Sequence, residues 1–206
     1  MSRNYPIMLQ LAEKKVVVIG GGRVAERKVR GLLGTGAHIA VISPEATGEI
    51  QTLALEGKIV WEKKFFSAED LQGAALIFAA TDNKDINRLV KSSAEKHQLV
   101  TIADDPDRSD FHLPAHVQRG RLSIAVSTGG ASPTLAKNLK AQLDQQFDER
   151  YEEYLEFLFK ARQWILQEVE DPALKRKLLT AIVSEDLLNS QNRTEDLRRL
   201  YEEFKP

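Results

Sequence analysis

Two adjacent carboxylates, Asp104 and Asp105, lie where an open α/β protein does its chemistry, directly after an apolar run from Leu99 to Ala103. The run predicts a buried strand. Side chains alternate between the two faces of an extended chain, so only one of the two carboxylates can point inward. The alternative is a plain turn, because Asp-Pro pairs such as Asp105-Pro106 open loops routinely. Position alone leaves both interpretations open.

A glycine cluster supplies a second candidate site, for phosphate. Gly20 and Gly22 lie in the pattern G-x-G-x-x-A, which ends at Ala25 and directly follows four β-branched residues, Val16 to Ile19. Gly20 allows a sharp turn, Gly22 lets the backbone approach a pyrophosphate, and Ala25 lets the following helix pack close to the strand. Free N–H groups at the start of that helix would bind the phosphates. An empty strand–helix turn is the alternative interpretation.

The elements around the glycines favour a nucleotide. Apolar residues recur at helical spacing after the glycines, and a second strand from Ile39 to Ile42 completes a βαβ unit. Another buried strand, Ala74 to Ala80, ends at Thr81. Because a parallel sheet binds ligands at the carboxyl ends of its strands, Thr81 is expected to face the same crevice as the glycines. A further short strand is expected from Tyr5 to Leu11, where apolar and polar residues alternate.

The adenosine ribose of a dinucleotide normally lies beyond the second strand, where many NAD sites carry an acidic residue. Here that position is Ile42 or Ser43, followed by Pro44 and Glu45, so a serine hydroxyl, the backbone or Glu45 would contact the ribose. No arginine stands between Ser43 and Ala46 to bind a 2′-phosphate, which favours NAD over NADP. The residues that we expect to contact NAD are Gly20, Gly22, Arg23, Val24, Ser43, Pro44 and Thr81.

The remainder of the chain contains one hairpin signal and then helices. Arg119-Gly120 predicts the hairpin turn, and a second glycine-rich loop, Ser127 to Pro133, opens a helix whose free N–H groups would accept a carboxylate. From Phe147 onward glycine disappears, and helical periodicity dominates. The aromatic residues of this region, among them Phe157 and Trp164, exceed what one thin bundle hides and suggest a partner subunit.

These patterns predict an α/β protein in three parts. Residues 1–113 form an NAD-binding domain with a Rossmann-type parallel sheet, 114–146 a small α+β segment, and 147–206 a helical domain. The 206 residues carry a formal net charge of −1, which favours neither nucleic acid nor another polyanion. The absence of cysteine excludes disulfides, thiolate metal sites and cysteine nucleophiles. No signal peptide or membrane span is recognisable, so a cytoplasmic protein is expected.

With these residues placed, the chain resembles the precorrin-2 dehydrogenase family of the sirohaem pathway, which includes the amino-terminal part of fused sirohaem synthases. The resemblance covers almost all of the first 140 residues, with the family's motifs in its order and spacing. These motifs are VVVIGGGRVAERK at 16–28, SP at 43–44, ATDNKDIN at 80–87, ADDPDRSDFHLPA at 103–115 and RGRLSIAVSTGGASPTLAKNLK at 119–140. The helical region matches in position and character more than in residues.

The resemblance implies an NAD-dependent oxidation of precorrin-2, a reduced tetrapyrrole with many carboxylate arms, to sirohydrochlorin. It assigns the role of general base to Asp104, since a carboxylate in hydrogen-bond reach can take a proton that the oxidation releases. It also implies that 114–146 is a dimerisation segment that completes the partner's active site in an intertwined homodimer. Ser127, in the glycine-rich loop, is expected to lie in the substrate pocket. Thr101 stands where the family usually has asparagine, and its hydroxyl can still form a hydrogen bond.

Two alternative functions stay open. Some relatives also insert iron into sirohydrochlorin, and the sequence does not distinguish such a bifunctional enzyme. His112 and His116 are separated by Pro114, which argues against a helical metal pair, so no metal ligands are assigned. An NAD(H)-sensing regulatory module is the alternative of another class, although the clustered basic face of a DNA reader is missing. The basic residues that either bind substrate carboxylates or form a solvated face are Arg108, Arg119, Arg121, Lys137 and Lys140.

Overall fold

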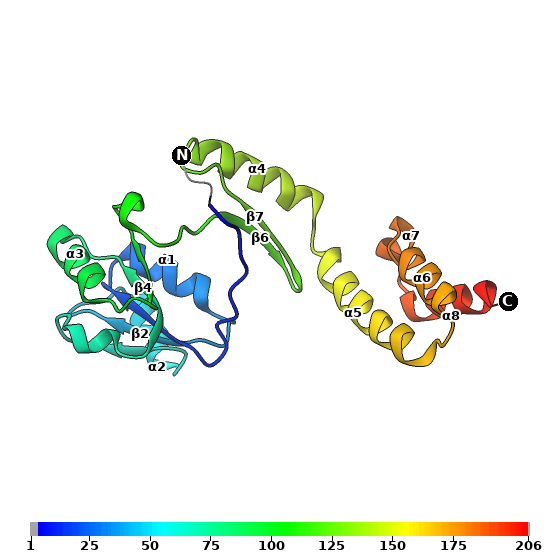
Figure 1. The fold of residues 1–206 in the computed structure, drawn as a ribbon, viewed down its shortest axis with the longest axis horizontal. Coiled ribbons are helices and arrows are strands. Elements are labelled where there is room, and N and C mark those ends of the chain that lie inside the picture. The colour runs from blue at the N-terminus through cyan, green and yellow to red at the C-terminus, as the bar shows by residue number, and fades with distance from the viewer. Residues whose placement is uncertain (1–3, 206) are drawn as a thin grey trace. The chain divides into compact units, whose positions relative to one another are not determined.

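The first of two structural units (Figure 1) contains a sheet of five parallel strands. Their order in the sheet is β3-β2-β1-β4-β5. The structure is a computed structural model that describes residues 4–205, and the first unit ends at Leu113. The strands are β1 (Lys15–Ile19), β2 (His38–Ile42), β3 (Val60–Glu62), β4 (Ala74–Ala79) and β5 (Leu99–Ile102). The strand order reverses between β1 and β4, and open α/β sheets bind ligands at such a switch point.

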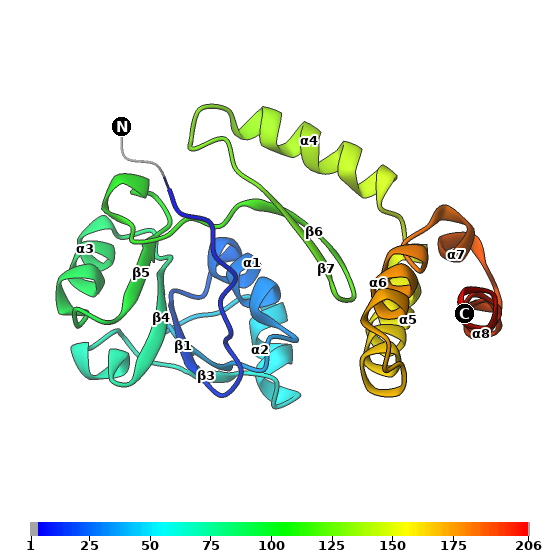
Figure 2. The ribbon, with the colours of Figure 1, turned by 45° about the vertical axis from the view of Figure 1, so that its right-hand side comes forward.

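Helices cover both faces of this sheet. Figure 2 shows α1 (Arg23–Leu32) and α2 (Gly48–Leu55) on one side and α3 (Lys84–Ser93) on the other. The alternation of β1 explains both contacts, because Val16 and Val18 pack with α1 and α2, whereas Val17 and Ile19 pack with α3. A strand that is buried on both faces must be apolar throughout. Two short 3₁₀ helices, η1 (Ala68–Leu71) and η2 (Pro106–Arg108), complete the unit.

The strand expected from Tyr5 to Leu11 is not formed. Residues 5–10 are exposed and pair with no strand, and only Leu11 packs against the core beneath α1 and α2. Alternating polarity produces a strand only where the segment pairs with the edge of another strand. Residues 5–10 pair with neither of the outer strands of this sheet, β3 and β5. The prediction of a sixth strand from this alternation was therefore wrong.

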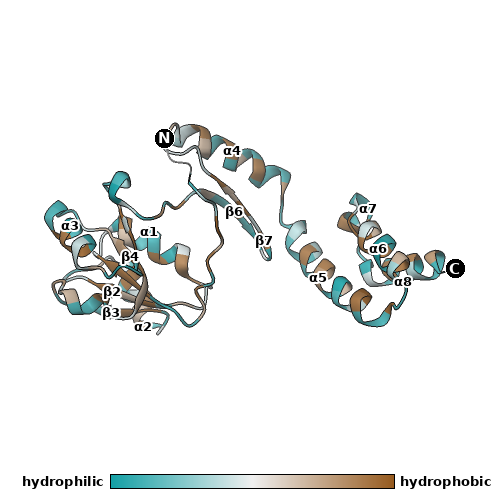
Figure 3. Ribbon diagram, viewed as in Figure 1, coloured by the Kyte–Doolittle hydropathy of each residue, from teal (hydrophilic) through white to brown (hydrophobic). Residues whose placement is uncertain are grey.

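The second unit, from Pro114, combines a hairpin with helices. The antiparallel strands β6 (Ala115–Arg119) and β7 (Leu122–Val126) pack against α4 (Pro133–Gln146). The helices that follow are α5 (Arg150–Glu168), α6 (Pro172–Ala181), α7 (Glu185–Asn189) and α8 (Arg193–Phe204). These helices share a core of their own, and Figure 3 shows its hydrophobic residues alternating with hydrophilic ones along α5. In the described part of the chain, every helix is too short or too polar to cross a membrane.

Candidate functional site

The glycine loop after β1 is packed against two other strand ends. Gly20 has a φ of +115°, and a Cβ added to it would lie 2.4 Å from the carbonyl oxygen of Ala80, which follows β4. A Cβ on Gly21 would lie 2.0 Å from the carbonyl oxygen of Glu45, in the loop after β2. Both distances are too short for any side chain, so glycine is required at both positions. The ends of β1, β2 and β4 therefore meet around this loop.

The third glycine has an open environment. Gly22 is the N-cap residue of α1, and no atom lies within 4 Å of the position that its Cβ would occupy. Among the described residues no side chain caps α1, whereas Thr47 caps α2 and Asn83 caps α3. The predicted contacts Arg23 and Val24 are exposed in the first turn of α1. An open backbone and an uncapped helix N-terminus fit the diphosphate of a dinucleotide.

The loop after β2 carries the other predicted contacts on this side of the sheet. Ser43 is only 8% exposed, and its carbonyl accepts a hydrogen bond from the indole nitrogen of Trp61 at 3.0 Å. The Ser43 hydroxyl is turned toward the glycine loop, where it lies 2.9 Å from the Cβ position of Gly21. Pro44 is half-buried and Glu45 is exposed. Of the groups expected at the ribose, Glu45 therefore offers the accessible side chain.

The two adjacent carboxylates have different partners. Asp105 caps η2, because its Oδ1 accepts a hydrogen bond from the N–H of Arg108 at 3.3 Å. Asp104 accepts a hydrogen bond from the amide nitrogen Nδ2 of Asn87, at 3.1 Å from its Oδ1, and its side chain is exposed. No residue in the range 4–205 donates a hydrogen bond to its second oxygen, Oδ2. Asp105 thus holds the loop, while Asp104 keeps a free oxygen at the carboxyl end of β5.

Asn87, on the buried face of α3, connects Asp104 to Thr81. Its Oδ1 accepts hydrogen bonds from the N–H of Thr81 at 3.1 Å and from its hydroxyl at 2.7 Å. The Thr81 nitrogen in turn lies 3.1 Å from the Cβ position of Gly20, so direct contacts link the glycine loop to Asp104. Sequence reasoning missed Asn87. The available signal was a polar residue on the apolar stripe of a helix, three positions before the buried Val90.

Two side chains hold the loop after β5 against that strand. The Oγ of Ser109 accepts a hydrogen bond from the N–H of Ile102, and Oδ2 of Asp110 accepts one from the N–H of Val100, both at 2.8 Å. Oδ1 of Asp110 pairs with Lys91 of α3 at 2.5 Å. Burial alone would raise the pKa of Asp110, but the hydrogen bonds from Lys91 and Val100 and the lysine charge together lower that pKa below its ordinary value.

In the second unit, the predicted substrate contact Ser127 lies on an exposed glycine-rich loop. Its Oγ accepts a hydrogen bond from the N–H of Gly129 at 3.2 Å, and Gly129 and Gly130 have φ angles of +60° and +85°. Ser132 then caps α4 by accepting a hydrogen bond from the N–H of Leu135 at 3.1 Å. The loop is therefore a structured turn with Ser127 accessible at its start.

Most of the predicted basic residues already pair with acidic side chains. The pairs are Arg108 with Asp105, Arg119 and Lys140 with Asp144, and Arg121 with Glu156. Lys137 is exposed and forms no ion pair within the described chain. His112 and His116 are also exposed. No group of three or more His, Asp or Glu side chains that could hold a metal ion occurs among residues 4–205.

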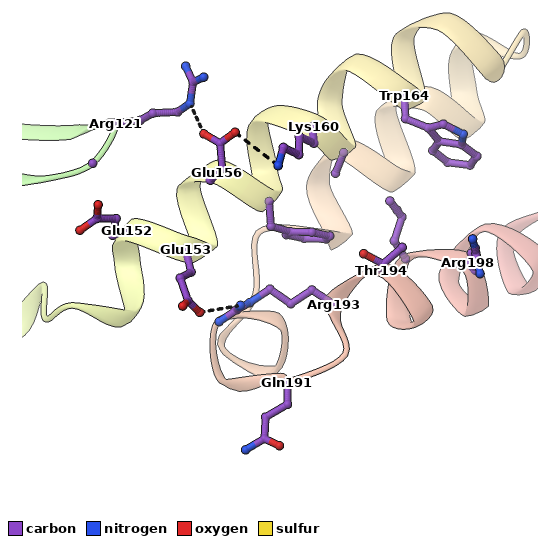
Figure 4. A pocket seen from close by; sticks show the side chains of 14 residues that line it. Arg121, Glu152, Glu153, Glu156, Lys160, Trp164, Gln191, Arg193, Thr194 and Arg198 are labelled. Carbon is purple, nitrogen blue, oxygen red and sulfur yellow. Dashed lines mark hydrogen bonds and ion pairs between the residues drawn. The ribbon is translucent and has the colours of Figure 1, made fainter.

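A hollow of about 930 Å³ in the second unit lies beside α5 and the start of α8 (Figure 4). Phe157 and Trp164 form part of its apolar lining. At its rim Arg121 is bound to Glu156 at 2.8 Å, and Arg193 lies 3.7 Å from Glu153. Lys160 lies 3.6 Å from the same Glu156, and Arg198 adds a fourth cation to the lining, so most but not all of the positive charge at the hollow is paired with a carboxylate.

The fold and site of the first unit define a class. A parallel sheet with a glycine loop at its switch point and an uncapped helix after that loop is a Rossmann-type dinucleotide-binding domain. Comparison with known proteins gives the family: the chain belongs to the precorrin-2 dehydrogenases. A family model described as NAD(P)-binding matches residues 7–115. Models for the central region of sirohaem biosynthesis proteins and for the SirC C-terminal domain match residues 119–146 and 151–195.

Individual relatives agree with this assignment. The precorrin-2 dehydrogenase of Priestia megaterium is 34% identical over 201 residues, which cover 98% of this chain and 100% of that protein. A solved structure of SirC, a precorrin-2 dehydrogenase, matches with a TM-score of 0.83 at 34% identity over 98% of this chain and 100% of that one, which confirms the predicted fold class. Siroheme synthase 3 of Aeromonas hydrophila is 41% identical over 140 residues, which cover 68% of this chain and 30% of the synthase.

Proposed function

We propose that this chain is an NAD-dependent dehydrogenase that oxidises precorrin-2 to sirohydrochlorin in sirohaem biosynthesis. The observation that carries the proposal is the match to a precorrin-2 dehydrogenase over 100% of that protein's length. The sheet edge supports it, because a loop suited to a diphosphate is linked by direct contacts to a carboxylate with a free oxygen. Such an oxidation needs an acceptor for a hydride and an acceptor for a proton.

Each group in this site has a defined task in the proposed reaction. Bound NAD supplies the acceptor for the hydride that leaves the macrocycle. Asp104 takes the accompanying proton, from carbon or pyrrole nitrogen, through Oδ2 while Oδ1 stays bonded to Asn87. The N–H groups at the start of α1 hold the diphosphate. The residues proposed to contact NAD are Gly20, Gly22, Arg23, Val24, Ser43, Pro44 and Thr81.

We propose NAD rather than NADP as the coenzyme. No arginine lies between Ser43 and Ala46, and Glu45 is exposed in the loop that touches Gly21. A carboxylate at this place can accept hydrogen bonds from the ribose hydroxyls and would repel a 2′-phosphate.

We further propose a homodimer in which 114–146 is the dimerisation segment between the NAD-binding domain and the helical domain, and carries Ser127 to the partner's substrate. The two-stranded sheet of β6 and β7 depends on further packing, which α4 supplies on one side. Leu135 and Leu139 of α4 are 50% and 37% exposed, which leaves apolar surface for a second chain. The exposure of Asp104 in the single chain also fits a site that another surface completes.

Formation of NADH from NAD and precorrin-2, followed by absorbance, tests the proposed reaction. Asp104→Asn is expected to lower kcat by about 100-fold or more, because the general base is lost while the side chain keeps its size. Asp105→Asn is the matched control, since its amide oxygen can still cap η2 and the rate should stay within about threefold of wild type. A wild-type rate in the Asp104→Asn variant would refute the assignment of the base.

The same preparation separates the alternatives. A nucleotide-sensing regulatory module would bind NAD(H) and leave precorrin-2 unchanged. A bifunctional dehydrogenase and ferrochelatase would, in addition to forming NADH, convert sirohydrochlorin to its metal complex when ferrous iron is supplied, which changes the absorption spectrum of the macrocycle. The three outcomes are therefore read from one paired assay of oxidation and metal insertion.

A further inference from the structure

We infer that Asn87 is a positioning residue that couples the turn at Thr81, on the coenzyme side, to the carboxylate of Asp104. The inference rests on the proposed function, because it gives Asn87 a task in the same oxidation. Asn87 belongs to α3, but its amide reaches the chain segments that follow β4 and β5. One buried side chain thus joins the end of β4, where the coenzyme is proposed to bind, to the end of β5, where Asp104 is proposed to accept the proton.

The amide of Asn87 uses its full hydrogen-bonding capacity. Oδ1 accepts from the N–H of Thr81 at 3.1 Å and from its hydroxyl at 2.7 Å, and the carbonyl oxygen of Asn83, at 2.9 Å, shares that one hydroxyl hydrogen. Nδ2 donates to the carbonyl oxygen of Thr81 and to Oδ1 of Asp104, both at 3.1 Å. Two donors and two acceptor positions are all that a carboxamide offers. Because Asn87 is 1% exposed, water cannot replace any of these partners.

The partners also fix the orientation of the amide. A backbone N–H can only donate, so the atom that faces the Thr81 nitrogen must be the oxygen of Asn87. The –NH₂ group then faces two acceptors, the Thr81 carbonyl and the Asp104 carboxylate. This bond holds Oδ1 of Asp104 and leaves Oδ2 available for a proton. A shift of the Thr81 turn, as when coenzyme binds beside it, is therefore transmitted to the carboxylate.

Stabilising α3 does not require this amide. Asn83 already caps the helix, because its Oδ1 accepts hydrogen bonds from the N–H groups of Asp85 and Ile86 at 2.9 and 3.2 Å. Position 87 lies on the buried stripe of α3 with Val90, where an aliphatic residue would pack without any polar partner. All hydrogen bonds of the Asn87 amide go to residues outside α3, namely Thr81 and Asp104. Holding these two residues in place therefore explains why position 87 carries a buried amide.

A second buried amide provides a matched control at the other end of β5. Gln98 is 4% exposed and donates from Nε2 to the carbonyl oxygens of Leu71, at 2.5 Å, and Ala74, at 3.0 Å. Asn87→Asp and Gln98→Glu both replace a buried –NH₂ that faces two acceptors by an oxygen, so both should lower the melting temperature. Only the first change affects a bond to Asp104.

The two variants are compared by kinetics and by binding. Asn87→Asp is expected to lower kcat for precorrin-2 oxidation by about 10-fold to 100-fold, the effect of losing a hydrogen bond to a charged group. The new carboxyl beside Asp104 should also move the acidic limb of the kcat profile to higher pH, which a purely structural role would not do. Fluorescence titration with NADH alone should show an affinity about threefold or more weaker than that of wild type, because the change disturbs Thr81, which is proposed to contact the coenzyme. Gln98→Glu should keep kcat and NADH affinity within about twofold of wild type.

The outcomes distinguish this inference from the proposed function. If wild-type protein does not oxidise precorrin-2, the proposed function fails before Asn87 is tested. The positioning role is overturned if wild type is active and Asn87→Asp keeps the wild-type kcat, pH profile and NADH affinity. It is also overturned if Asn87→Asp changes these three quantities no more than Gln98→Glu does. Should Asn87→Asp not fold, Asn87→Ser, whose shorter hydroxyl cannot reach Asp104, is measured against Gln98→Ser by the same criteria.

Discussion

The backbones of Gly20 and Ala80 approach so closely that only a hydrogen atom fits on the Cα of Gly20. The position of a Cβ there would be 2.4 Å from the carbonyl oxygen of Ala80 and 2.8 Å from its carbonyl carbon. The chain turns at this point from β1 toward α1, and β4 ends on the other side of the contact. Gly20 therefore allows the ends of β1 and β4 to lie in direct contact at the switch point where the coenzyme is proposed to bind.

Gly20→Ala is expected to destabilise the protein by about 3 kcal/mol or more, because it combines a clash with backbone atoms and a side chain at a φ of +115°. Neither the carbonyl of Ala80 nor β4, which ends one residue before it, can move without disturbing the centre of the sheet. Urea unfolding followed by circular dichroism measures the change. An unfolding midpoint equal to that of wild type would show that the loop is less constrained than its contacts indicate.

Gly22→Ala, unlike Gly20→Ala, should weaken coenzyme binding and leave the stability of the fold nearly unchanged. The φ of −81° suits any residue and the space around the Cβ position is open, so the free energy of unfolding should change by less than about 1 kcal/mol. The added methyl group would occupy the place proposed for the diphosphate, and NADH affinity should fall by about tenfold or more. Equal NADH affinity in wild type and variant, with the fold retained, would place the diphosphate elsewhere.

Local sequence patterns were sufficient to predict the frame of the site. The apolar run of β1, the three glycines and the apolar stripe of α1 are contiguous in the chain, and each follows from the spacing of neighbouring residues. Thr81 and Asp104 were predicted at the correct sheet edge because the carboxyl ends of parallel strands share that edge. The fold class was confirmed by the solved relative.

The remaining features depend on contacts between distant parts of the chain. Sequence reasoning could not tell which of Asp104 and Asp105 faces the sheet edge, because that depends on a bond from Asn87, 17 positions away in sequence. It also missed α7, whose five residues are too few to show a helical period. Short helices and buried polar residues are determined by their tertiary contacts. The residue pattern of a single segment does not reveal those contacts.

Replacing Glu45 should relax the preference for NAD. In Glu45→Gln, the ratio of kcat/KM with NADP to that with NAD is expected to rise by about tenfold, because a negative charge no longer faces the 2′-phosphate. Glu49→Gln is the control: it removes the same charge from the first turn of α2, where Glu49 lies 3.4 Å from Arg30. A ratio unchanged in both variants would assign the discrimination to another residue.

Asp110 should make the stability of the first unit depend on acid pH. Its pKa is lowered in the folded protein, so the stabilisation that its carboxylate contributes is present above the pKa of the unfolded chain and is lost as the pH falls through the folded value. Asp110→Asn should therefore cost about 1 kcal/mol at pH 7, a modest figure because the side chain is 34% exposed. The difference from wild type should shrink below about pH 4.

Urea unfolding of wild type and Asp110→Asn between pH 3 and pH 7 measures this dependence. Asp107→Asn is the control, since Asp107 is exposed on the same loop and forms no ion pair with any residue that the structure describes. It removes the same charge without removing a bond to Lys91 or to the N–H of Val100. If the stability gap between wild type and Asp110→Asn stayed constant across this pH range, packing rather than the carboxylate charge would account for the contribution of Asp110 to stability.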